Sequence, residues 1–497
     1  MNYFVILQLI SNTYFMANII GRKNQVAELL HCYNSGKAEF VVLYGRRRVG
    51  KTYLVNEVFR DRFAFSHTGL APFQKTAAGM MAERLQSFYF SLRHYGLEDC
   101  VCPKSWIEAF ELLRRLLERK TDAERQVVFI DEMPWMDTPR AGFLTALEGF
   151  WNGWACNRRE IMLIVCGSAT SWIQNKLIGA RGGLYNRITN QIKLQPFTLG
   201  ESEELFKKMG LVLTRRDIVE AYMATGGIPY YLNYFRKGLS LAQNIDRLFF
   251  AIDAKLSDEF NRLFASLFTS PEEYRKIIEV LSTRHGGLSR DEILARTGMA
   301  NGGGITTQLK ALEESGFIRS YQPMGFARKR TLYQVVDNFC LFWLKFKTGK
   351  TAVTDPEFWQ HNVNAPALNS WRGIAFENVC MVHIDQIKRA LSIAGIATTH
   401  YSWIQRGDEA TAGTQVDLVI DRADGVANLC EMKYTRGEFA IDHKYYQTLD
   451  NRIATFTQAL PRRIKSVQLT MITASGLKAN QYSGIVQSAL TADALFS

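Results

Sequence analysis

Short, almost wholly apolar runs alternate with longer amphipathic segments in the first 200 residues of the chain. The runs AEFVVLYG (38–45), RQVVFIDE (125–132) and EIMLIVCGSA (160–169) have the pattern of buried strands, and the segments between them have helical spacing. Strands that are apolar on both faces and alternate with helices are typical of a parallel sheet covered on both sides. This part of the sequence therefore predicts an α/β domain built on a parallel sheet.

The pattern changes after residue 200. Residues 200–262 have helical spacing throughout, and between residues 263 and 346 three helix-like segments precede two strand-like runs. Three helices followed by a hairpin are typical of a winged helix-turn-helix. Its expected recognition helix, ITTQLKALEESG, contains two glutamates, whereas the expected wing, GFARKRT, is basic. DNA contact and a purely structural role of this module both remain open.

The last part of the chain, from residue 366, returns to a mixed pattern. It reads as a helix, strands at 414–421 and 426–433, a helix at 442–459, the strand SVQLTMIT and a last helix. This order predicts a second α/β domain.

The composition is that of a globular protein, with 47% hydrophobic and 22% charged residues in 497. No apolar run reaches the ~18 residues that a membrane-spanning helix needs. Eight scattered cysteines are typical of a reduced, cytoplasmic protein. The apolar N-terminus lacks a basic region and a cleavage site, so we expect no signal peptide, and Met16 is a second candidate start. The net charge of +12 favours a polyanionic partner, with a solvated basic surface as the alternative.

The segment GRRRVGKT, Gly45 to Thr52, matches the phosphate-binding pattern G-x-x-x-x-G-K-[ST] and lies between a strand and a helix. The two glycines let the backbone wrap around phosphate oxygens, and the helix that follows adds aligned amides. Lys51 places a charge on the β- and γ-phosphates, and Thr52 offers a hydroxyl to Mg²⁺. The expected ATP-contacting residues are Gly45, Arg46, Arg47, Arg48, Val49, Gly50, Lys51, Thr52 and Tyr53.

Two acids follow the buried strand VVFI, and they complete this predicted site. Asp131 fits the role of holding Mg²⁺, and Glu132 fits the role of polarising the attacking water. A third strand ends at VCGSAT, where Ser168 or Thr170 can contact phosphate or water, or can cap the next helix. Downstream, Arg187 is a candidate arginine finger acting in trans, with an ordinary surface arginine as the alternative. The same two readings apply to Arg181.

Together these segments resemble the archaeal-type AAA-like ATPases, which are related to signalling NTPases of the STAND class. The resemblance rests on IIGRKNQVAELL, FVVLYGRRRVGKT, VVFIDEMPWMD, VCGSAT, IKLQPFTLGE and TGGIPYYLNYF, and it spans roughly residues 18–460. It implies nucleotide binding by Gly45, Gly50, Lys51 and Thr52, Mg²⁺ and hydrolysis roles for Asp131 and Glu132, a sensor near Ser168, and a finger at Arg187.

Three charges stand within the two C-terminal strands. Asp417, followed by Glu431-x-Lys433, has the D…E-x-K arrangement of the PD-(D/E)XK nuclease superfamily, which this domain resembles. Glu431 and Lys433 are two residues apart on one strand and share a face. Asp417 and Glu431 can then hold Mg²⁺ with a scissile phosphate, and Lys433 can orient water. Glu377 is the expected helical acid of this metal site, and Gln447 is expected nearby. The alternative is an ion pair on a solvated sheet edge.

The sequence thus predicts a P-loop NTPase core at 18–199, a helical lid at 200–262, a winged helix at 263–346 and a PD-(D/E)XK-like domain at 366–497. The expected function is a cytoplasmic, Mg²⁺-dependent ATPase whose nucleotide state gates the winged helix and a nuclease-like domain acting on DNA or another nucleic acid. The alternative is a signalling switch whose C-terminal domain docks a partner without cleavage. Both readings allow a homo-oligomer or a protein partner.

Overall fold

A computed structural model of the protein describes residues 19–71, 77–120, 124–138, 141–168, 170–179, 183–184, 186–322, 331–348, 354–405, 413–460 and 463–497. The chain divides into two compact units, Met1–Gln195 and Pro196–Ser497, which are described one after the other. Among the helices of the described residues, none has both the length and the hydropathy for crossing a membrane.

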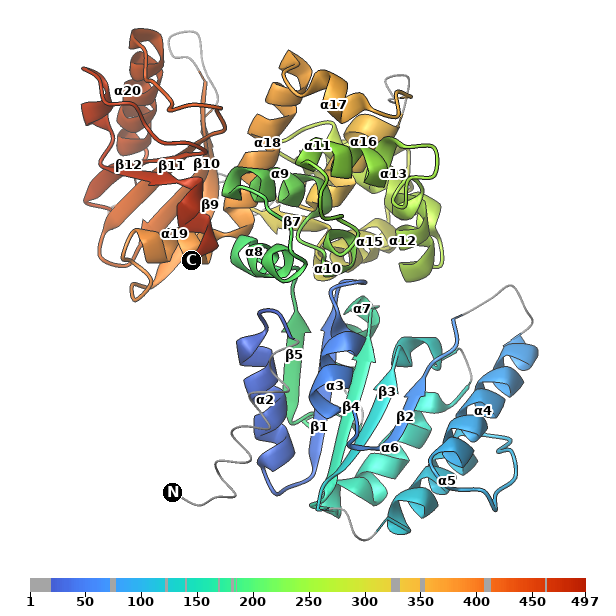
Figure 1. Ribbon diagram of the computed structural model, residues 1–497. Coiled ribbons are helices and arrows are strands. Elements are labelled where there is room, and N and C mark those ends of the chain that lie inside the picture. The colour runs from blue at the N-terminus through green and yellow to red at the C-terminus, as the bar shows by residue number, and fades with distance from the viewer. Residues whose placement is uncertain are drawn as a thin grey trace, which may run out of the picture. The chain divides into compact units, whose positions relative to one another are not determined.

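The first unit is built on a five-stranded parallel sheet with the order β2-β3-β4-β1-β5 (Figure 1). Its strands are β1 (Glu39–Gly45), β2 (Phe63–Thr68), β3 (Gln126–Asp131), β4 (Ile161–Gly167) and β5 (Asn190–Leu194). Its helices are α2 (Lys23–Asn34), α3 (Lys51–Phe59), α4 (Ala77–His94), α5 (Trp106–Glu118), α6 (Phe143–Gly153) and α7 (Thr170–Ile173). The predicted parallel sheet is therefore present.

The three strands expected from their apolar runs form the centre of this sheet. Strands β1, β3 and β4 are buried at every position. The face of the sheet that carries Phe40, Val128 and Leu163 packs against side chains of α4, α5 and α6. The edge strands β2 and β5 are partly exposed, so their sequences contain polar residues and did not stand out as strands.

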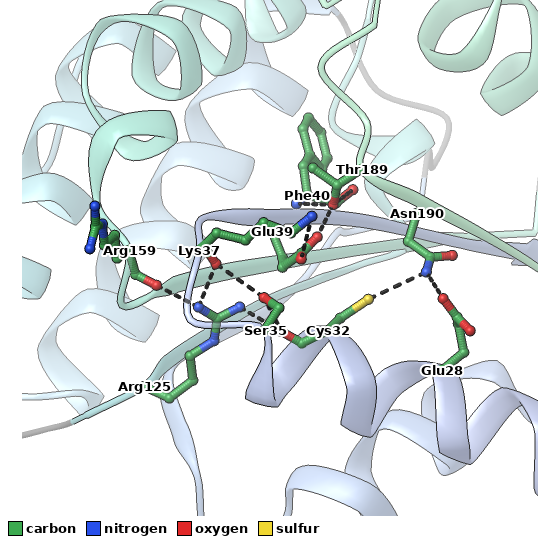
Figure 2. A network of polar contacts seen from close by, with 10 residues as sticks. All are labelled: Glu28, Cys32, Ser35, Lys37, Glu39, Phe40, Arg125, Arg159, Thr189 and Asn190. Carbon is green, nitrogen blue, oxygen red and sulfur yellow. Dashed lines mark hydrogen bonds and ion pairs between the residues drawn. The ribbon is translucent and has the colours of Figure 1, made fainter.

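Arg125 anchors the amino edge of the sheet (Figure 2). Its guanidinium donates hydrogen bonds to the carbonyl oxygens of Cys32 at 2.8 Å, Lys37 at 2.7 Å and Arg159 at 2.5 Å. Cys32 belongs to α2, Lys37 precedes β1 and Arg159 precedes β4. The Arg125 side chain therefore joins α2 to the segments before β1 and β4. The opposite, carboxyl edge of the sheet carries the phosphate loop.

The second unit begins with helices and a small sheet. The helices are α8 (Leu199–Lys208), α9 (Arg215–Thr225), α10 (Pro229–Leu232), α11 (Leu241–Ile245), α12 (Glu259–Leu267), α13 (Pro271–Ser282), α14 (Arg290–Thr297), α15 (Gly303–Glu314) and α16 (Asn338–Lys347). Strands β6 (Leu288–Ser289), β7 (Ile318–Tyr321) and β8 (Leu332–Val335) pair antiparallel in the order β6-β8-β7. Most of the expected basic wing, residues 325–330, lies outside the described residues.

The C-terminal part of this unit is a five-stranded mixed sheet with the order β13-β12-β11-β10-β9. Its strands are β9 (Thr398–Gln405), β10 (Thr414–Arg422), β11 (Val426–Lys433), β12 (Ser466–Thr473) and β13 (Ser488–Thr491). Its helices are α17 (Phe358–Asn362), α18 (Pro366–Val382), α19 (Ile384–Ala390) and α20 (His443–Gln458). The prediction of a last helix is wrong. Residues 488–491 form a strand that pairs in parallel with β12, and only a short 3₁₀ helix, Ala492–Phe496, follows.

Candidate active site

The phosphate loop leaves β1 at Gly45 and enters α3 at Lys51. Gly45 has a φ of 147°, and a Cβ atom there would lie 2.2 Å from the backbone oxygen of Leu194 on the neighbouring strand β5. Gly50, the residue before the helix, has a φ of 92°. Both glycines of the motif therefore occupy conformations that a side chain would disfavour, and at Gly45 no side chain fits.

Lys51 is buried, with 5% of its surface exposed. Its ammonium donates to the carbonyl oxygens of Gly45 at 3.1 Å and Arg46 at 3.0 Å, and to the hydroxyl of Ser168 at 3.0 Å. Ser168 follows β4, which pairs with β1 in parallel. The topology therefore brings a loop lysine and a serine 117 residues later to the same edge of the sheet.

Thr52 and Asp131 meet beside this lysine. The Thr52 hydroxyl donates to a carboxylate oxygen of Asp131 at 2.7 Å, and Asp131, at the end of β3, is 3% exposed. Mg²⁺ prefers oxygen ligands and is commonly held by one or two protein groups together with substrate phosphates. A hydroxyl and a carboxylate that converge next to a phosphate loop fit that ion.

Glu132 has a left-handed backbone, with a φ of 46°, directly after β3. Its carboxylate accepts hydrogen bonds from the Ser168 hydroxyl at 2.7 Å and from the Ser168 amide at 3.3 Å. Because the Ser168 hydroxyl also accepts from Lys51, the three side chains form one continuous line. Thr170, the other residue considered for this position, has a side chain outside the described part of the structure.

The remaining residues of the loop differ in exposure. Arg46 and Val49 are buried, whereas 53% of Tyr53 is exposed. Arg48 has a positive φ of 72°. The guanidinium of Arg47 lies over the ring of Trp135, 5.7 Å from its centroid.

Arg22 is a residue whose role in this site the sequence did not reveal. It is buried, with a φ of 56°, and it donates to the carbonyl oxygens of Val49 at 3.3 Å and Gln195 at 2.7 Å. It thereby joins the phosphate loop to the residue that follows β5. Its place in the motif IIGRKNQ was visible, but a contact with a residue 173 positions away was not.

Arg187 lies at the other end of the sheet from the phosphate loop. It is exposed and precedes β5, whose last residue, Leu194, pairs with Gly45. The amide of Thr189 bonds to Phe40, near the start of β1. The register therefore separates Arg187 from the phosphate loop of its own chain, and only a neighbouring copy could receive this arginine as a finger. Arg181 lies outside the described residues.

In the C-terminal sheet, Glu431 is paired on the side of α20. It is 8% exposed and accepts hydrogen bonds from the Tyr445 hydroxyl and the Arg452 guanidinium. The ammonium of Lys433 lies 2.8 Å from the Glu431 carboxylate and 5.1 Å from the centroid of the Tyr445 ring. Burial and the charge of Glu431 raise the pKa of the Tyr445 phenol. Glu431 is thus held by three groups of its own domain.

Asp417 does not share the surroundings of Glu431, because β10 contains an irregularity in its pairing with β9. The register with β9 shifts by one between Val416 and Val419, and both valines face the apolar cluster under α20. Valines three apart would face opposite sides of a regular strand, so the extra residue turns Asp417 away from that cluster. Asp417 instead lines a pocket with Glu377 of α18, and its carboxylate accepts a hydrogen bond from Gln415 at 2.6 Å.

The expectation that Glu377, Asp417 and Glu431 gather around one ion is therefore corrected for the conformation seen here. Across the described ranges, no three carboxylate, imidazole or thiolate side chains converge as a metal-binding group. The reason is the one-residue shift in β10, which places Asp417 and Glu431 in different environments. Gln447, on α20, is near His443, with 3.4 Å between their nitrogens.

Glu377 has an unexpected partner, His285, 92 residues earlier in the chain. Their nearest side-chain atoms are 2.6 Å apart. Burial raises the pKa of Glu377, and the charge of Asp417 raises it further against the opposing effect of His285. Burial lowers the pKa of His285, but the hydrogen bond and charge of Glu377 outweigh it, so that pKa is raised.

Comparison with protein families and curated sequences shows what the chain is similar to. Residues 19–235 match the model of an ATPase domain predominantly from Archaea. An uncharacterized protein of Methanocaldococcus jannaschii is 24% identical over 423 residues, which are 84% of this chain and 87% of that protein. An uncharacterized ATP-binding protein of the same organism is 37% identical over 49 residues, 10% of this chain and 83% of that protein.

Solved structures with a similar arrangement have low sequence identity. A Walker-type ATPase of Pyrococcus abyssi is 19% identical with a TM-score of 0.49, and the match covers 66% of this chain and 97% of that one. The ORC2 protein of Aeropyrum pernix is 14% identical with a TM-score of 0.39, covering 66% of this chain and 95% of that one.

Proposed function

We propose that this chain, an ATPase of the archaeal P-loop type, hydrolyses ATP with Mg²⁺ at the site formed by Lys51, Thr52, Asp131, Glu132 and Ser168. The observation that carries this proposal is the hydrogen-bonded line from Lys51 through Ser168 to Glu132. It links the group that binds phosphate to the group that acts on water.

In this proposal each residue has one task. Lys51 and the amides at the start of α3 bind the β- and γ-phosphates. Thr52 and Asp131 hold Mg²⁺, which supplies positive charge to the phosphate oxygens when bound. Glu132 accepts a hydrogen bond from the attacking water and orients it toward the γ-phosphate. Ser168 keeps the Glu132 carboxylate at the carboxyl edge of β4.

Substitution of the lysine tests the phosphate site. Lys51→Ala should reduce steady-state ATP turnover ~100-fold or more, because the variant lacks the ammonium group that stabilises the negative charge of the transferred phosphoryl group. Lys23→Ala, at an exposed lysine at the start of α2, is the matched control and should leave turnover unchanged. Turnover at the wild-type rate by Lys51→Ala protein would show that the site is assigned wrongly.

For the second unit we propose a helical lid at 200–262, a winged helix at 263–346 and a PD-(D/E)XK-like domain at 366–497, after an ATPase core at 18–199. The order of α13, α14, α15, β7 and β8 supports the winged helix. Strands β10 and β11 with the flanking helices α18 and α20 support the nuclease-like domain. The net charge of +12 favours DNA or another nucleic acid as partner, in the cytoplasm.

The second candidate function is a signalling switch in which the C-terminal domain docks a partner and does not cleave. The pairing of Glu431 with Arg452, Tyr445 and Lys433 favours it, because a carboxylate held by two cations and a phenol is a poor ligand for a further cation. Metal-dependent DNA and RNA degradation by wild type and Glu431→Ala protein, with and without ATP, separates the two functions. Equal residual cleavage by wild type and Glu431→Ala protein would exclude nuclease activity of the C-terminal domain.

A further inference from the structure

A small polar pocket in the second unit joins two segments far apart in the sequence. One side belongs to the module formed by residues 271–335, and the other belongs to α18 and strands β9 and β10. The pocket is lined by His285, Gly286, Arg319, Tyr321, Gln334, Glu377, Asn378, Met381, Ser402, Gln415 and Asp417. The only aliphatic side chain in this set is that of Met381.

The module side of the pocket is a connected polar frame. Gln334 on β8 donates to the carbonyl oxygen of His285 at 2.7 Å and accepts from the Arg319 guanidinium at 2.9 Å. The Tyr321 hydroxyl donates to the carbonyl oxygen of Gly286 at 2.6 Å, and Arg319 lies over the Tyr321 ring at 5.1 Å. These contacts hold the Arg319 guanidinium, the Tyr321 hydroxyl and the backbone of His285 and Gly286 in place.

The opposite side of the pocket presents two carboxylates. Glu377 contacts His285 at 2.6 Å, and Asp417 lines the same pocket as Arg319. His285 and Glu377 are only 29% and 20% exposed in their side chains. The imidazole of His285 and the guanidinium of Arg319 thus line the same pocket as both carboxylates.

We propose that the module of residues 271–335 covers Glu377 and Asp417 as an autoinhibitory cap, and that the C-terminal domain acts on nucleic acid only when this cap has moved. The proposal rests on the nuclease-like function proposed above. The Arg319 guanidinium supplies positive charge, and the His285 imidazole supplies a hydrogen-bonding partner for Glu377, at the place where a divalent cation would bind in the open state. The contact is polar, and polar contacts between parts of one chain separate more readily than apolar cores.

Hydrogen exchange of the full chain tests the cap. His285→Glu places a negative charge against Glu377 and should speed amide exchange in residues 413–421 and 374–381 between ~5-fold and ~150-fold, the range of typical coupling between sites. His285→Gln still donates a hydrogen bond to Glu377 and should exchange like wild type. Arg284→Ala, at an exposed neighbour paired with Glu292, is the matched control.

Four results have defined meanings. Faster exchange in His285→Glu alone, with metal-dependent DNA degradation raised by a similar factor, supports the cap and the nuclease. Faster exchange with no degradation by any variant supports the cap and overturns the nuclease. Unchanged exchange in His285→Glu protein, with its ATP turnover intact, overturns the cap. Equal acceleration in His285→Glu, His285→Gln and Arg284→Ala shows general loosening of the module and also overturns the cap.

Discussion

The phosphate site and the C-terminal acidic residues were both predicted from residue spacing, but the structure assembles only the first. In the first unit, the carboxyl ends of parallel strands meet at one edge, so Lys51, Asp131 and Ser168 come together whatever the details of the loops. In the second unit, one extra residue in β10 places Asp417 and Glu431 in different surroundings. A site set by topology can be predicted from spacing, whereas a site that depends on the facing of single strand residues cannot.

The largest expected effect contrasts one glycine from each region. Gly45→Ala should lower the free energy of unfolding by about 3 kcal/mol or more, because the new methyl group would lie 2.2 Å from the Leu194 backbone oxygen. Gly425→Ala, in the turn between β10 and β11, should cost about 1 kcal/mol, because its positive φ is strained but its nearest neighbour is 3.3 Å away. Urea unfolding of both variants measures the difference. Equal costs would contradict the steric role of Gly45.

Acid is expected to lower the free energy of unfolding of both units by an amount similar to that of Gly45→Ala. Burial lowers the pKa of His67 in the first unit and of His383 in the second to about 4, from the usual 6.5. Between about pH 6.5 and pH 4, the unfolded chain therefore binds protons at His67 and His383 that the folded chain does not bind. The stability from each neutral imidazole is present above about pH 6.5 and is lost as the pH falls toward 4, by about 3 kcal/mol for each histidine.

Substitution of each histidine measures how much of the acid-induced loss of stability comes from His67 and how much comes from His383. His383 accepts a hydrogen bond from the Leu199 amide and contacts the Val379 carbonyl oxygen at 2.7 Å. His383→Gln should be less stable at pH 7 and should show a smaller loss between pH 6.5 and 4, measured by urea unfolding at each pH. An unchanged slope in both His383→Gln and His67→Gln would contradict the neutral buried imidazoles.

The smallest effect is expected at Arg187. Because this residue lies at the amino edge of the sheet, Arg187→Ala should leave ATP turnover of dilute protein within about twofold of wild type. If copies assemble, the loss should grow with protein concentration, since the finger would come from a neighbour. A large loss that is independent of concentration would place Arg187 at its own phosphate loop, against the register of β1 and β5.

The sequence was sufficient for most of the fold that positions the phosphate site. Apolar runs located β1, β3 and β4, and the motif located the loop and its acids. Edge strands β2 and β5 were hidden because half-exposed strands contain polar residues. A terminal helix was expected where β13 pairs with β12, since a short run gives no clear period. The contacts of Arg22 and His285 join residues far apart in the chain, and no local pattern specifies them.

Nucleotide turnover of two matched glutamine variants tests the central claim most directly. Glu132→Gln removes the carboxylate that bonds to Ser168, whereas Glu431→Gln removes the one that pairs with Arg452 and Lys433. We expect Glu132→Gln to lower kcat for ATP ~100-fold or more, with its Kd for ATP nearly unchanged, and Glu431→Gln to leave kcat within about twofold. Wild-type turnover by Glu132→Gln protein, or an equal loss in both variants, would contradict the assignment of ATP hydrolysis to the assembled site.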